Sequence, residues 1–478
     1  MTVSADSEGS LFGKTLGVIT TPIPGMLVFE LPVHGDNRGW FKENWQREKM
    51  AALGLPDFGP VQNNISFNDA VGTTRGIHAE PWDKWVSVAT GRIFGAWVDL
   101  REGDSHGNVF TIEIDPSRAV FVPRGVGNAY QTLEPDTAYT YLVNDHWSPD
   151  ATYSFLNLAD ETVAIPWPIP LDVAELSDKD RAHPRLADAS AVPQRKTLVL
   201  GANGQVGRAL RAAFSGDESV EFAGRSELSL ESEDLHAARR WRDYDTIVNA
   251  AAYTAVDTAE TADGRRAAWA ANAMGVARVA RIATDNGITL VHISSDYVFD
   301  GSLERPYRED DPVAPLGVYG QSKAAGDLAA STCPRHYILR TSWVIGDGKN
   351  FVQTMRSLAE RGVSPKVVDD QRGRLTFTED IARAIRHLLR VRAPYGIYNV
   401  SSGGEPMTWA GIARDVFAAT GHDPDLVTAV TTEEYFSAST APVSPRPLNS
   451  VLDLSKLANT GFIVANASER LDALLSDS

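Results

Sequence analysis

The stretch QRKTLVLGANGQVGRAL, residues 194–210, decides the fold of the second half of the chain. It reads as an apolar strand, a glycine-rich turn and a helix, the order in which a dinucleotide-binding domain begins. In its GxxGxxG spacing, the first glycine permits a tight turn, the second lets backbone N–H groups approach a pyrophosphate, and the third lets the helix pack on the strand. A purely structural turn is the alternative. The residues expected to hold the dinucleotide are Gly201, Asn203, Gly204, Gln205, Val206 and Gly207.

After this stretch, strand-like and helix-like segments alternate. The runs TLVLGA, TIVNAAA, TLVHISS and HYILRTS are short and apolar, and alanine-rich helical patterns such as RRAAWAANAMGVARVARIATDNG separate them. This alternation is typical of a parallel, doubly wound sheet. We therefore expect an α/β Rossmann domain with a smaller substrate-binding part.

The chain before this stretch has a different period. Up to about residue 170, short runs rich in β-branched and aromatic residues, such as GMLVFELPV and VFTIEI, alternate with turn signals. Many short strands at this spacing predict an antiparallel sandwich or barrel. Proline, alanine and serine interrupt both periods in DRAHPRLADASAVPQRK. We predict a first domain over residues 1–186, a linker over 187–196 that leaves the orientation free, and a second domain over 197–478.

Composition narrows the class of protein. A chain of 478 residues exceeds what one core usually supports, and its single cysteine, Cys333, excludes an intramolecular disulfide framework and fits a reducing cytoplasm. The first residues, MTVSADSEGSLFGK, lack the basic and apolar regions of a signal peptide, and no run approaches a membrane span. A net charge of −17 opposes general binding to nucleic acid or anionic lipid. We expect a cytoplasmic protein that binds a small molecule.

The end of the second expected strand bears on the choice of cofactor. An NAD-preferring site places Asp or Glu there, against the ribose hydroxyls. The stretch VEFAGRSEL, residues 220–228, offers Arg225 and Ser226 instead. Because an arginine suits the 2′-phosphate of NADP, we expect NADPH; NADH is the alternative if Arg225 is only a solvated surface residue.

The stretch VYGQSK places Tyr319 and Lys323 four residues apart, on one face of a helix. A nearby ammonium group favours phenolate over phenol. We therefore expect Lys323 to lower the pKa of Tyr319 and to help it exchange a proton with a sugar carbonyl oxygen.

Five motifs in a fixed order carry a family resemblance over residues 197–478. GQVG, NAAAYTAVD, SDYVFDG, VYGQSK and RTSW together resemble the extended short-chain dehydrogenase/reductases and, within them, the dTDP-4-dehydrorhamnose reductases. The resemblance implies a catalytic triad of Ser295, Tyr319 and Lys323. It also implies substrate contacts from Asp296 and Trp343, and further cofactor contacts from Ala250 and Ala251.

Three stretches of this chain differ from the patterns of related enzymes. The sibling dehydratases carry an Asp-Glu pair after the hydroxyl residue, whereas Tyr297 follows Asp296 here, which favours reduction over elimination. DQRGRLT, with Arg372, Arg374 and Leu375, and RPLNS, near Arg446, also depart from the usual reductase pattern. These two departures concern the substrate loops and leave the triad unchanged.

A β-rich domain with a lone histidine after RGI suggests a cupin. Metal-binding cupins present His-x-His, a carboxylate, and a further histidine after a PxG turn, because these ligands must fill most of the coordination sphere. The stretch TTRGIHAEPWDKW holds one histidine, His78, and VPRGVGNAYQ has Asn128 where another would stand. We therefore expect no metal site in the first domain.

A second resemblance covers residues 20–185. GDNRGWFKE, VQNNIS, TTRGIHAE, TAYTYLVNDHWSP and ELSDKD resemble, in this order, the dTDP-4-dehydrorhamnose 3,5-epimerases, which are metal-free, dimeric enzymes of cupin fold. The resemblance implies His78 as base, Asp180 as the residue that orients it and Tyr141 as acid. Asn128 and Ala79-Glu80 depart from the pattern near the substrate. Residues at positions that hold substrate or its phosphates are Arg38, Glu43, Gln62, Asn64, Arg75, Lys84, Asn128 and Lys179.

The two resemblances describe consecutive chemistry. Protons beside a 4-keto group are acidic because their loss gives an enolate, which Lys84 is placed to stabilise, so epimerisation must precede reduction of the ketone. We hypothesise a bifunctional, homodimeric enzyme that converts dTDP-4-dehydro-6-deoxyglucose to dTDP-L-rhamnose. The alternatives are a first domain that only binds or dimerises, and the same reactions on another nucleotide sugar or toward a 6-deoxy-talose product.

Overall fold

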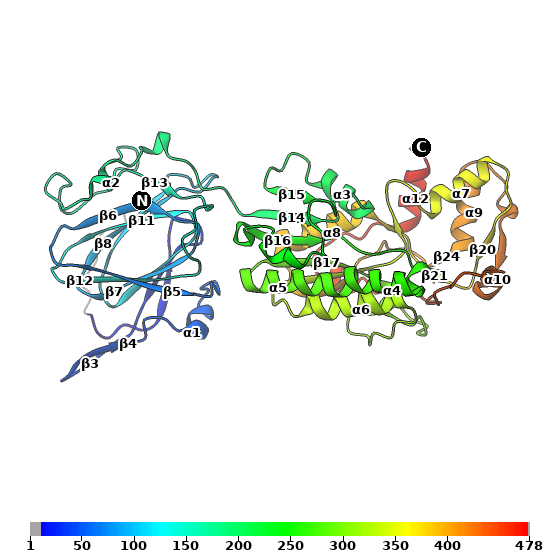
Figure 1. The fold of residues 1–478 in the computed structure, drawn as a ribbon, viewed down its shortest axis with the longest axis horizontal. Helices are drawn as coiled ribbons and strands as arrows, with labels where there is room; N and C mark the ends of the chain where they lie inside the picture. Colours follow the sequence, from blue (N-terminus) through cyan, green and yellow to red (C-terminus); the bar gives the residue numbers. More distant parts are fainter. Residues whose placement is uncertain (1–10, 477–478) are drawn as a thin grey trace. The chain divides into compact units, whose positions relative to one another are not determined.

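The structure, a computed structural model, describes residues 11–476. The chain divides into two compact units, Met1–Gln194 and Arg195–Ser478 (Figure 1). Residues 1–10 and 477–478 lie outside the described part, and with them most of the stretch MTVSADSEGSLFGK, for which we expect no signal peptide.

Two antiparallel sheets form the first unit, one of six strands in the order β1-β2-β10-β7-β12-β5 and one of five in the order β13-β6-β11-β8-β9. A hairpin, β3 (Val33–Asp36) and β4 (Gly39–Lys42), projects from them (Figure 1), and the helices are α1 (Arg47–Ala51) and α2 (Asp178–Arg181). The strands of the two sheets are β1 Gly17–Thr20, β2 Leu27–Glu30, β5 Gln62–Asn68, β6 Thr74–Ala79, β7 Lys84–Thr90, β8 Ile93–Asp99, β9 Val109–Ile114, β10 Arg118–Val122, β11 Val126–Thr132, β12 Thr137–Val143 and β13 Ser154–Phe155.

Alternate residues of facing strands fill the space between these sheets. Val86 and Val88 of β7 pack in one buried cluster with Trp97 of β8 and Val126 of β11. Successive strand residues point to opposite faces, so Trp85, directly before Val86, belongs to a different cluster that includes Met50 of α1. The predicted all-β, cupin-like jelly-roll barrel is confirmed.

Parts of the segment expected as a linker, residues 187–196, contact the first unit. Val192 is fully buried and pairs with Arg101, and the Ser154 hydroxyl donates a hydrogen bond to the Ser190 carbonyl at 2.6 Å. Strand β14 already begins at Lys196. Ser190 and Val192 therefore tie the start of the expected linker to the first unit, where Val192 belongs to an apolar cluster.

The second unit is built on a parallel sheet of six strands in the order β15-β14-β16-β17-β18-β23. Because β14 lies between β15 and β16, the strand order reverses there, and ligands of such sheets bind outside the carboxyl ends of the strands at that point. The strands are β14 Lys196–Leu200, β15 Val220–Ala223, β16 Tyr244–Asn249, β17 Thr289–Ser295, β18 His336–Thr341 and β23 Gly396–Asn399.

Helices cover both faces of this sheet (Figure 1). Leu198 and Leu200 point to the side of α5, whereas Val199 points to the side of α3 and α8, as the period of a strand requires. The predicted α/β Rossmann fold is thus confirmed. The helices are α3 Gln205–Ala213, α4 Ala262–Trp269, α5 Val276–Asn286, α6 Val318–Ser331, α8 Thr378–Val391 and α11 Ser455–Ala458, and a π-helical turn, Ala270–Gly275, joins α4 to α5.

A smaller part with its own core completes the second unit. Val352 and Met355 of α7 pack there with Ile412 and Phe417 of α9. Its elements are α7 Phe351–Glu360, α9 Trp409–Ala419, α10 Thr432–Phe436, α12 Ala467–Ser476, β19 Val344–Ile345, β20 Lys366–Val368, β21 Arg372–Gly373, β22 Thr376–Phe377, β24 Met407–Thr408 and β25 Thr428–Val430.

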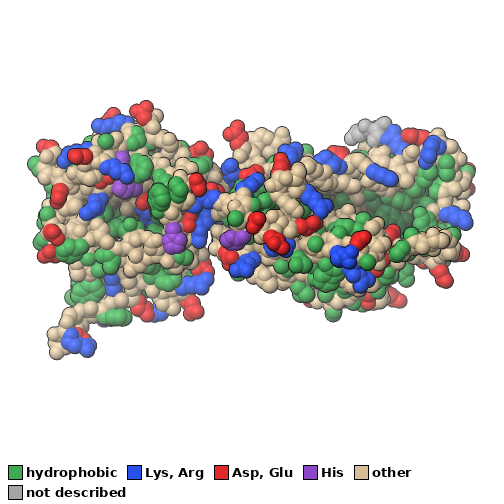
Figure 2. Space-filling view, viewed as in Figure 1, with side chains coloured by type: hydrophobic (Ala, Val, Ile, Leu, Met, Phe, Trp, Pro, Cys, Tyr) green, Lys and Arg blue, Asp and Glu red, His purple; other side chains and the backbone are tan. Residues whose placement is uncertain are grey.

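Charged side chains of both signs are interspersed with apolar ones over the visible surface (Figure 2). Among residues 11–476, no helix combines the length and the apolar character that crossing a membrane requires.

Candidate active sites

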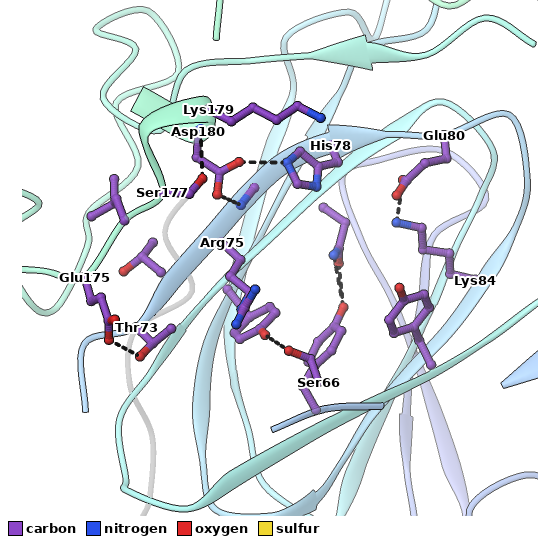
Figure 3. A pocket seen from close by; sticks show the side chains of 17 residues that line it. Ser66, Thr73, Arg75, His78, Glu80, Lys84, Glu175, Ser177, Lys179 and Asp180 are labelled. Atoms are coloured by element: carbon purple, nitrogen blue, oxygen red, sulfur yellow. Dashed lines mark hydrogen bonds and ion pairs between the residues drawn. The ribbon is translucent and has the colours of Figure 1, made fainter. Parts of the chain in front are cut away.

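A cavity of about 520 Å³ opens into the first unit between β5, β6, β7, β11, β12 and the segment around α2. Acidic, basic and aromatic side chains converge on it (Figure 3). Seven of the residues predicted from the sequence line it, namely Arg75, His78, Lys84, Asn128, Tyr141, Lys179 and Asp180.

His78 and Asp180 form a hydrogen-bonded pair on one side of this cavity (Figure 3). The His78 Nε2 lies 2.9 Å from Asp180 Oδ1, although the two residues are far apart in the sequence. The Ser177 hydroxyl caps α2 by accepting from the Asp180 amide at 3.1 Å, which fixes the carboxylate. Burial raises the pKa of Asp180, but the hydrogen bond and charge of His78 outweigh it, so this pKa lies below its ordinary value. Asp180 is therefore an anion that holds the imidazole in place.

Gly76 permits the close packing that positions His78. Its φ is +126°, and a Cβ atom there would stand 2.6 Å from the Cβ of Ala129 on β11. Any larger residue would push β6 away from β11 and move His78 with it.

Lys84 and Tyr141 lie on another side of the cavity. The Lys84 ammonium is buried in an ion pair with Glu80, and its Nζ stands 5.7 Å from the centre of the Tyr141 ring. Burial, and then the negative charge of Glu80, raises the pKa of Tyr141. Tyr141 therefore keeps its proton near neutral pH. Glu80, which the sequence marked only as a departure from a pattern, is the counter-ion of the site.

Asn128 lies directly opposite His78 in the pairing of β11 with β6. Its side-chain amide contacts the Tyr139 hydroxyl, with Nδ2 at 3.0 Å and Oδ1 at 3.2 Å. Tyr139 in turn stacks on Tyr130 with ring centres 4.2 Å apart. Asn128 thus adds a fixed polar group to the cavity wall without a second titrating imidazole.

Four predicted substrate residues do not line this cavity. Gln62 and Asn64 lie on β5 on the same face as Ser66, which does line it, so they extend its wall. Arg38 is on the projecting hairpin and pairs with Asp36, and Glu43 pairs with Lys49. Arg38 and Glu43 are therefore not brought to the cavity of their own chain.

The glycine-rich turn of the second unit fits a dinucleotide. Gly201 has a φ of +75°, and a Cβ there would stand 2.6 Å from the backbone nitrogen of Ala251. A Cβ on Gly207 would stand 2.3 Å from the Gly201 carbonyl oxygen. Gly204 caps α3 without a side chain, which leaves the first N–H groups of the helix accessible to phosphate.

Arg225 and Ser226 follow β15, beside this turn. The Arg225 side chain is 80% exposed and pairs with Glu231 at 2.9 Å. The Gly224 amide donates to Glu227 Oε2 at 2.6 Å. A guanidinium on an exposed arm can turn toward a 2′-phosphate, at the expense of the surface pair with Glu231.

Ser295, Tyr319 and Lys323 come together from β17 and α6. The Ser295 hydroxyl donates to Asp296 Oδ1 at 2.9 Å, and it also contacts the partly buried Tyr319. The Lys323 ammonium donates to the Ile293 carbonyl at 2.5 Å. These side chains lie at the carboxyl edge of the sheet, where a ligand is expected.

The expected effect of Lys323 on Tyr319 is wrong for this structure. Burial, and then the charge of Asp296, raises the pKa of Tyr319 to about 12. Burial also lowers the pKa of Lys323 to about 8, against the opposing charge of Asp327. Loss of hydration outweighs the attraction of ammonium for phenolate, because Lys323 points its charge at a backbone carbonyl.

Asp296 and Trp343 follow the carboxyl ends of the neighbouring strands β17 and β18. Burial raises the pKa of Asp296 to about 6, which hydrogen bonds from Ser450 and Ser295 oppose. Trp343 follows β18 and stacks on Trp409 with ring centres 3.8 Å apart. Register between β17 and β18 places Ser295 opposite Thr341, so both residues lie near the triad edge.

The residues that depart from the reductase pattern have structural partners. Arg374 donates to the carbonyls of Gly404 at 2.7 Å and Leu452 at 3.2 Å, and Arg446 pairs with Asp257 at 2.8 Å. These arginines hold loops together.

Comparison with known proteins identifies both units. The model of the RmlD substrate binding domain family matches residues 195–478, and that of the dTDP-4-dehydrorhamnose 3,5-epimerase family matches residues 20–188. A dTDP-4-dehydrorhamnose reductase of Sinorhizobium fredii is 38% identical over 274 residues, which are 55% of this chain and 91% of that protein. An RmlC homolog of Streptococcus pyogenes serotype M6 is 52% identical over 173 residues, which are 35% of this chain and 87% of that protein.

A solved structure agrees for the second unit. The dTDP-4-dehydrorhamnose reductase of Bacillus anthracis, in complex with NADP, is 31% identical, with a TM-score of 0.54. The match covers 59% of this chain and 99% of that chain.

Proposed function

Since the chain belongs to the dTDP-4-dehydrorhamnose 3,5-epimerase family over residues 20–188 and to the RmlD substrate binding domain family over residues 195–478, we propose that it is a bifunctional enzyme of nucleotide-sugar synthesis. The first unit inverts carbons 3 and 5 of dTDP-4-dehydro-6-deoxyglucose, and the second reduces the 4-ketone to give dTDP-L-rhamnose. The observation that carries this function is the His78–Asp180 pair, held at 2.9 Å in a cavity ahead of the reductase. A module that only binds or dimerises has no need of it.

His78 is the base of the epimerisation. Its neutral ring donates the Nε2 proton to Asp180, so the lone pair lies on Nδ1 and accepts a proton from the carbon beside the ketone. Asp180 keeps this tautomer and stabilises the imidazolium that forms. Lys84 stabilises the negative charge that develops on the ketone oxygen, and Glu80 is the ion-pair partner of Lys84.

Tyr141 is the acid of the epimerisation. Because its pKa is raised, it carries a proton that it can donate to the enolate carbon from the face opposite His78. Return of the proton on the opposite face inverts the carbon.

Tyr319 supplies the proton in the reduction. When bound, NADPH supplies the hydride that the ketone carbon accepts. Tyr319 is protonated near neutral pH, since its pKa is about 12, and gives its proton to the ketone oxygen. Ser295 orients that oxygen, and the protonated Lys323 offsets the charge left on Tyr319.

NADPH is the preferred cofactor, and the epimerase works without a metal. The glycine-rich turn accepts a pyrophosphate, and Arg225, on its exposed arm, is the group that would meet a 2′-phosphate. The enolate is stabilised by the Lys84 ammonium, so the reaction as drawn does not call on a Lewis acid. A kinetic preference for NADH over NADPH would contradict the role of Arg225.

The active species is a homodimer formed through the first unit. Phe41 on the hairpin and Ile65 and Phe67 on the outer face of β5 are 65%, 68% and 56% exposed. Exposed apolar side chains on an edge strand and a projecting hairpin favour contact with a second copy. Such a contact also explains why Arg38 lies outside the cavity of its own chain, since the hairpin can present it to the cavity of the partner.

The cytoplasm is the compartment that suits this enzyme. Its single cysteine, Cys333, is a buried free thiol, in keeping with a reducing environment.

Product analysis tests the whole sequence of reactions. The full chain is incubated with dTDP-4-dehydro-6-deoxyglucose and NADPH, and the sugar product is identified by NMR. We expect dTDP-L-rhamnose. A product that keeps the gluco configuration at carbons 3 and 5 would contradict the epimerase, and a 6-deoxy-talose product would contradict the proposed face of reduction.

A further inference from the structure

A third ionisable side chain, His183, lies against the His78–Asp180 pair and has no part in the mechanism above. It follows α2, and its side chain is 6% exposed. Its ring packs edge-on against His78, with centres 5.3 Å apart, and stacks on Phe155 at 5.0 Å. Two imidazoles and a carboxylate therefore share one corner of the cavity.

The polar atoms of these three residues converge. Asp180 Oδ1 lies 2.9 Å from His78 Nε2 and 3.9 Å from His183 Nε2, and one ligand atom from each residue lies within 4.8 Å of the others. Within residues 11–476, neither ring nitrogen of His183 forms a hydrogen bond of ordinary geometry. The backbone of Gly76 interacts with the His183 ring, but a buried imidazole without a hydrogen bond of ordinary geometry is unfavourable and calls for a ligand, such as an ion.

We propose that His78, Asp180 and His183 form a binding site for Zn²⁺ or a similar transition metal ion, and that its occupation switches the epimerase off. This inference rests on the role of His78 in the proposed function. Zn²⁺ binds imidazole and carboxylate at about 2.0–2.2 Å in a tetrahedron, so its ligand atoms stand about 3.3 Å apart. The distances of 2.9 and 3.9 Å lie on either side of that spacing. Two imidazoles favour Zn²⁺ over Mg²⁺ or Ca²⁺.

Inhibition follows from the tautomer of His78. A metal on Nε2 displaces the proton that this nitrogen shares with Asp180, and that proton leaves to solvent. Uptake of one proton from solvent on Nδ1 balances this loss and leaves the ring neutral, with its only lone pair, on Nε2, bound to the metal. No electron is transferred, and the net charge of the ring is unchanged. His78 can no longer accept a proton from the sugar.

The second unit provides an internal control. Among the described residues, this trio is the one group of His, Cys, Asp or Glu side chains close enough to share a metal ion in this way. Zn²⁺ should therefore stop proton exchange at the sugar and leave reduction of the already epimerised ketone unchanged.

Binding is measured on the full chain, after treatment with a chelator, by titration with Zn²⁺ and by the visible absorption of Co²⁺ as a spectroscopic substitute. The expected result is one equivalent per chain, with a tetrahedral Co²⁺ spectrum. His183→Gln removes a ligand, and His183→Phe does so while keeping the ring stack on Phe155. Either should weaken binding by about 100-fold, and should relieve the inhibition of each variant relative to its own metal-free rate. His106→Gln, at an exposed histidine of the same unit, is the control and should bind and be inhibited like the parent chain.

Two outcomes would overturn the site: no Zn²⁺ bound by the chelator-treated chain, or equal Zn²⁺ affinity in the parent chain and both His183 variants. Failure of the proposed function gives a different result. A chain that lacks epimerase activity but binds Co²⁺ through His183 keeps the site and refutes the role of the first unit.

Discussion

The candidate catalytic residues of the two units differ in what surrounds their ionisable groups. In the first unit, the charged groups have close polar partners: Asp180 is hydrogen-bonded to His78, and Lys84 forms an ion pair with Glu80. In the second unit, Lys323 is buried and Tyr319 is partly buried, and loss of water shifts the pKa of each toward its neutral form, to about 8 and about 12 respectively. Both sites keep a phenol protonated through burial, Tyr141 and Tyr319, but only the first adds the paired groups His78–Asp180 and Lys84–Glu80.

This contrast suits the two reactions. Epimerisation removes a proton and returns one at each of two carbons, so its base and acid must be restored within the cycle. Reduction consumes one proton, and a buried phenol gives it up only when negative charge develops on the ketone oxygen. This difference is tested by changing one site and measuring both activities.

Removing the phenol should give the largest effect. Tyr319→Phe should lower the rate of NADPH oxidation with the epimerised ketone by about 10³-fold, because the oxygen loses its proton donor. Proton exchange in the first unit should stay unchanged. Tyr395→Phe, at a half-exposed tyrosine of the same unit, is the control. Near-normal NADPH oxidation by Tyr319→Phe would contradict the triad.

Removing the carboxylate of Asp180 should have the next largest effect. Asp180→Asn should slow proton exchange by about 10²-fold, since the amide no longer fixes the tautomer of His78 or stabilises its imidazolium. Reduction of the epimerised ketone should not change. Asp178→Asn, on the exposed side of the same helix, should leave both rates as they are. Equal exchange rates in the two variants would show that Asp180 does not orient the base.

The pH dependence of reduction tests whether the charge of Lys323 is needed. Its pKa of about 8 means that it is protonated below pH 8 and loses its charge above it. The rate of reduction should be level below this pH and should then fall by up to about tenfold per pH unit. The measurement is the pH profile of single-turnover NADPH oxidation. A profile that stays level to pH 10 would mean that the charge of Lys323 is not needed.

The smallest effect concerns assembly. Ile65→Asp places a charge on the exposed face of β5 and should shift the chain from dimer to monomer in sedimentation experiments. Epimerase activity should fall several-fold, and the rate of reduction should not change. Val173→Asp, at an exposed valine of the same unit, should leave the dimer intact. A chain that sediments as a monomer before any substitution would refute the homodimer.

The sequence predicted more of the second unit than of the first site. The glycine spacing and the Tyr319–Lys323 pair are local patterns, so a strand-turn-helix and a helix face follow from them. The pairing of His78 with Asp180 joins distant segments, and only the family resemblance connected them in advance. Arg38 was expected at the substrate, yet it lies on a hairpin that no local pattern places.

Some features could not be predicted from the sequence for physical reasons. The pKa of Tyr319 depends on how completely water is excluded, which spacing along a helix does not report. Glu80 was noted only as an unusual residue, although its i,i+4 distance from Lys84 was visible. His183 does not fit the His-x-His pattern of cupins, because its partner His78 lies on β6 whereas His183 follows α2.

The central claim is that the unit ahead of the reductase is an active epimerase whose base is His78. The most direct measurement incubates the full chain with the 4-keto sugar in heavy water without NADPH, so that reduction is idle, and follows deuterium by NMR. We expect deuterium at carbons 3 and 5, and its loss in His78→Gln while reduction of the epimerised ketone persists. No deuterium with the parent chain, or equal deuterium with His78→Gln, would contradict it.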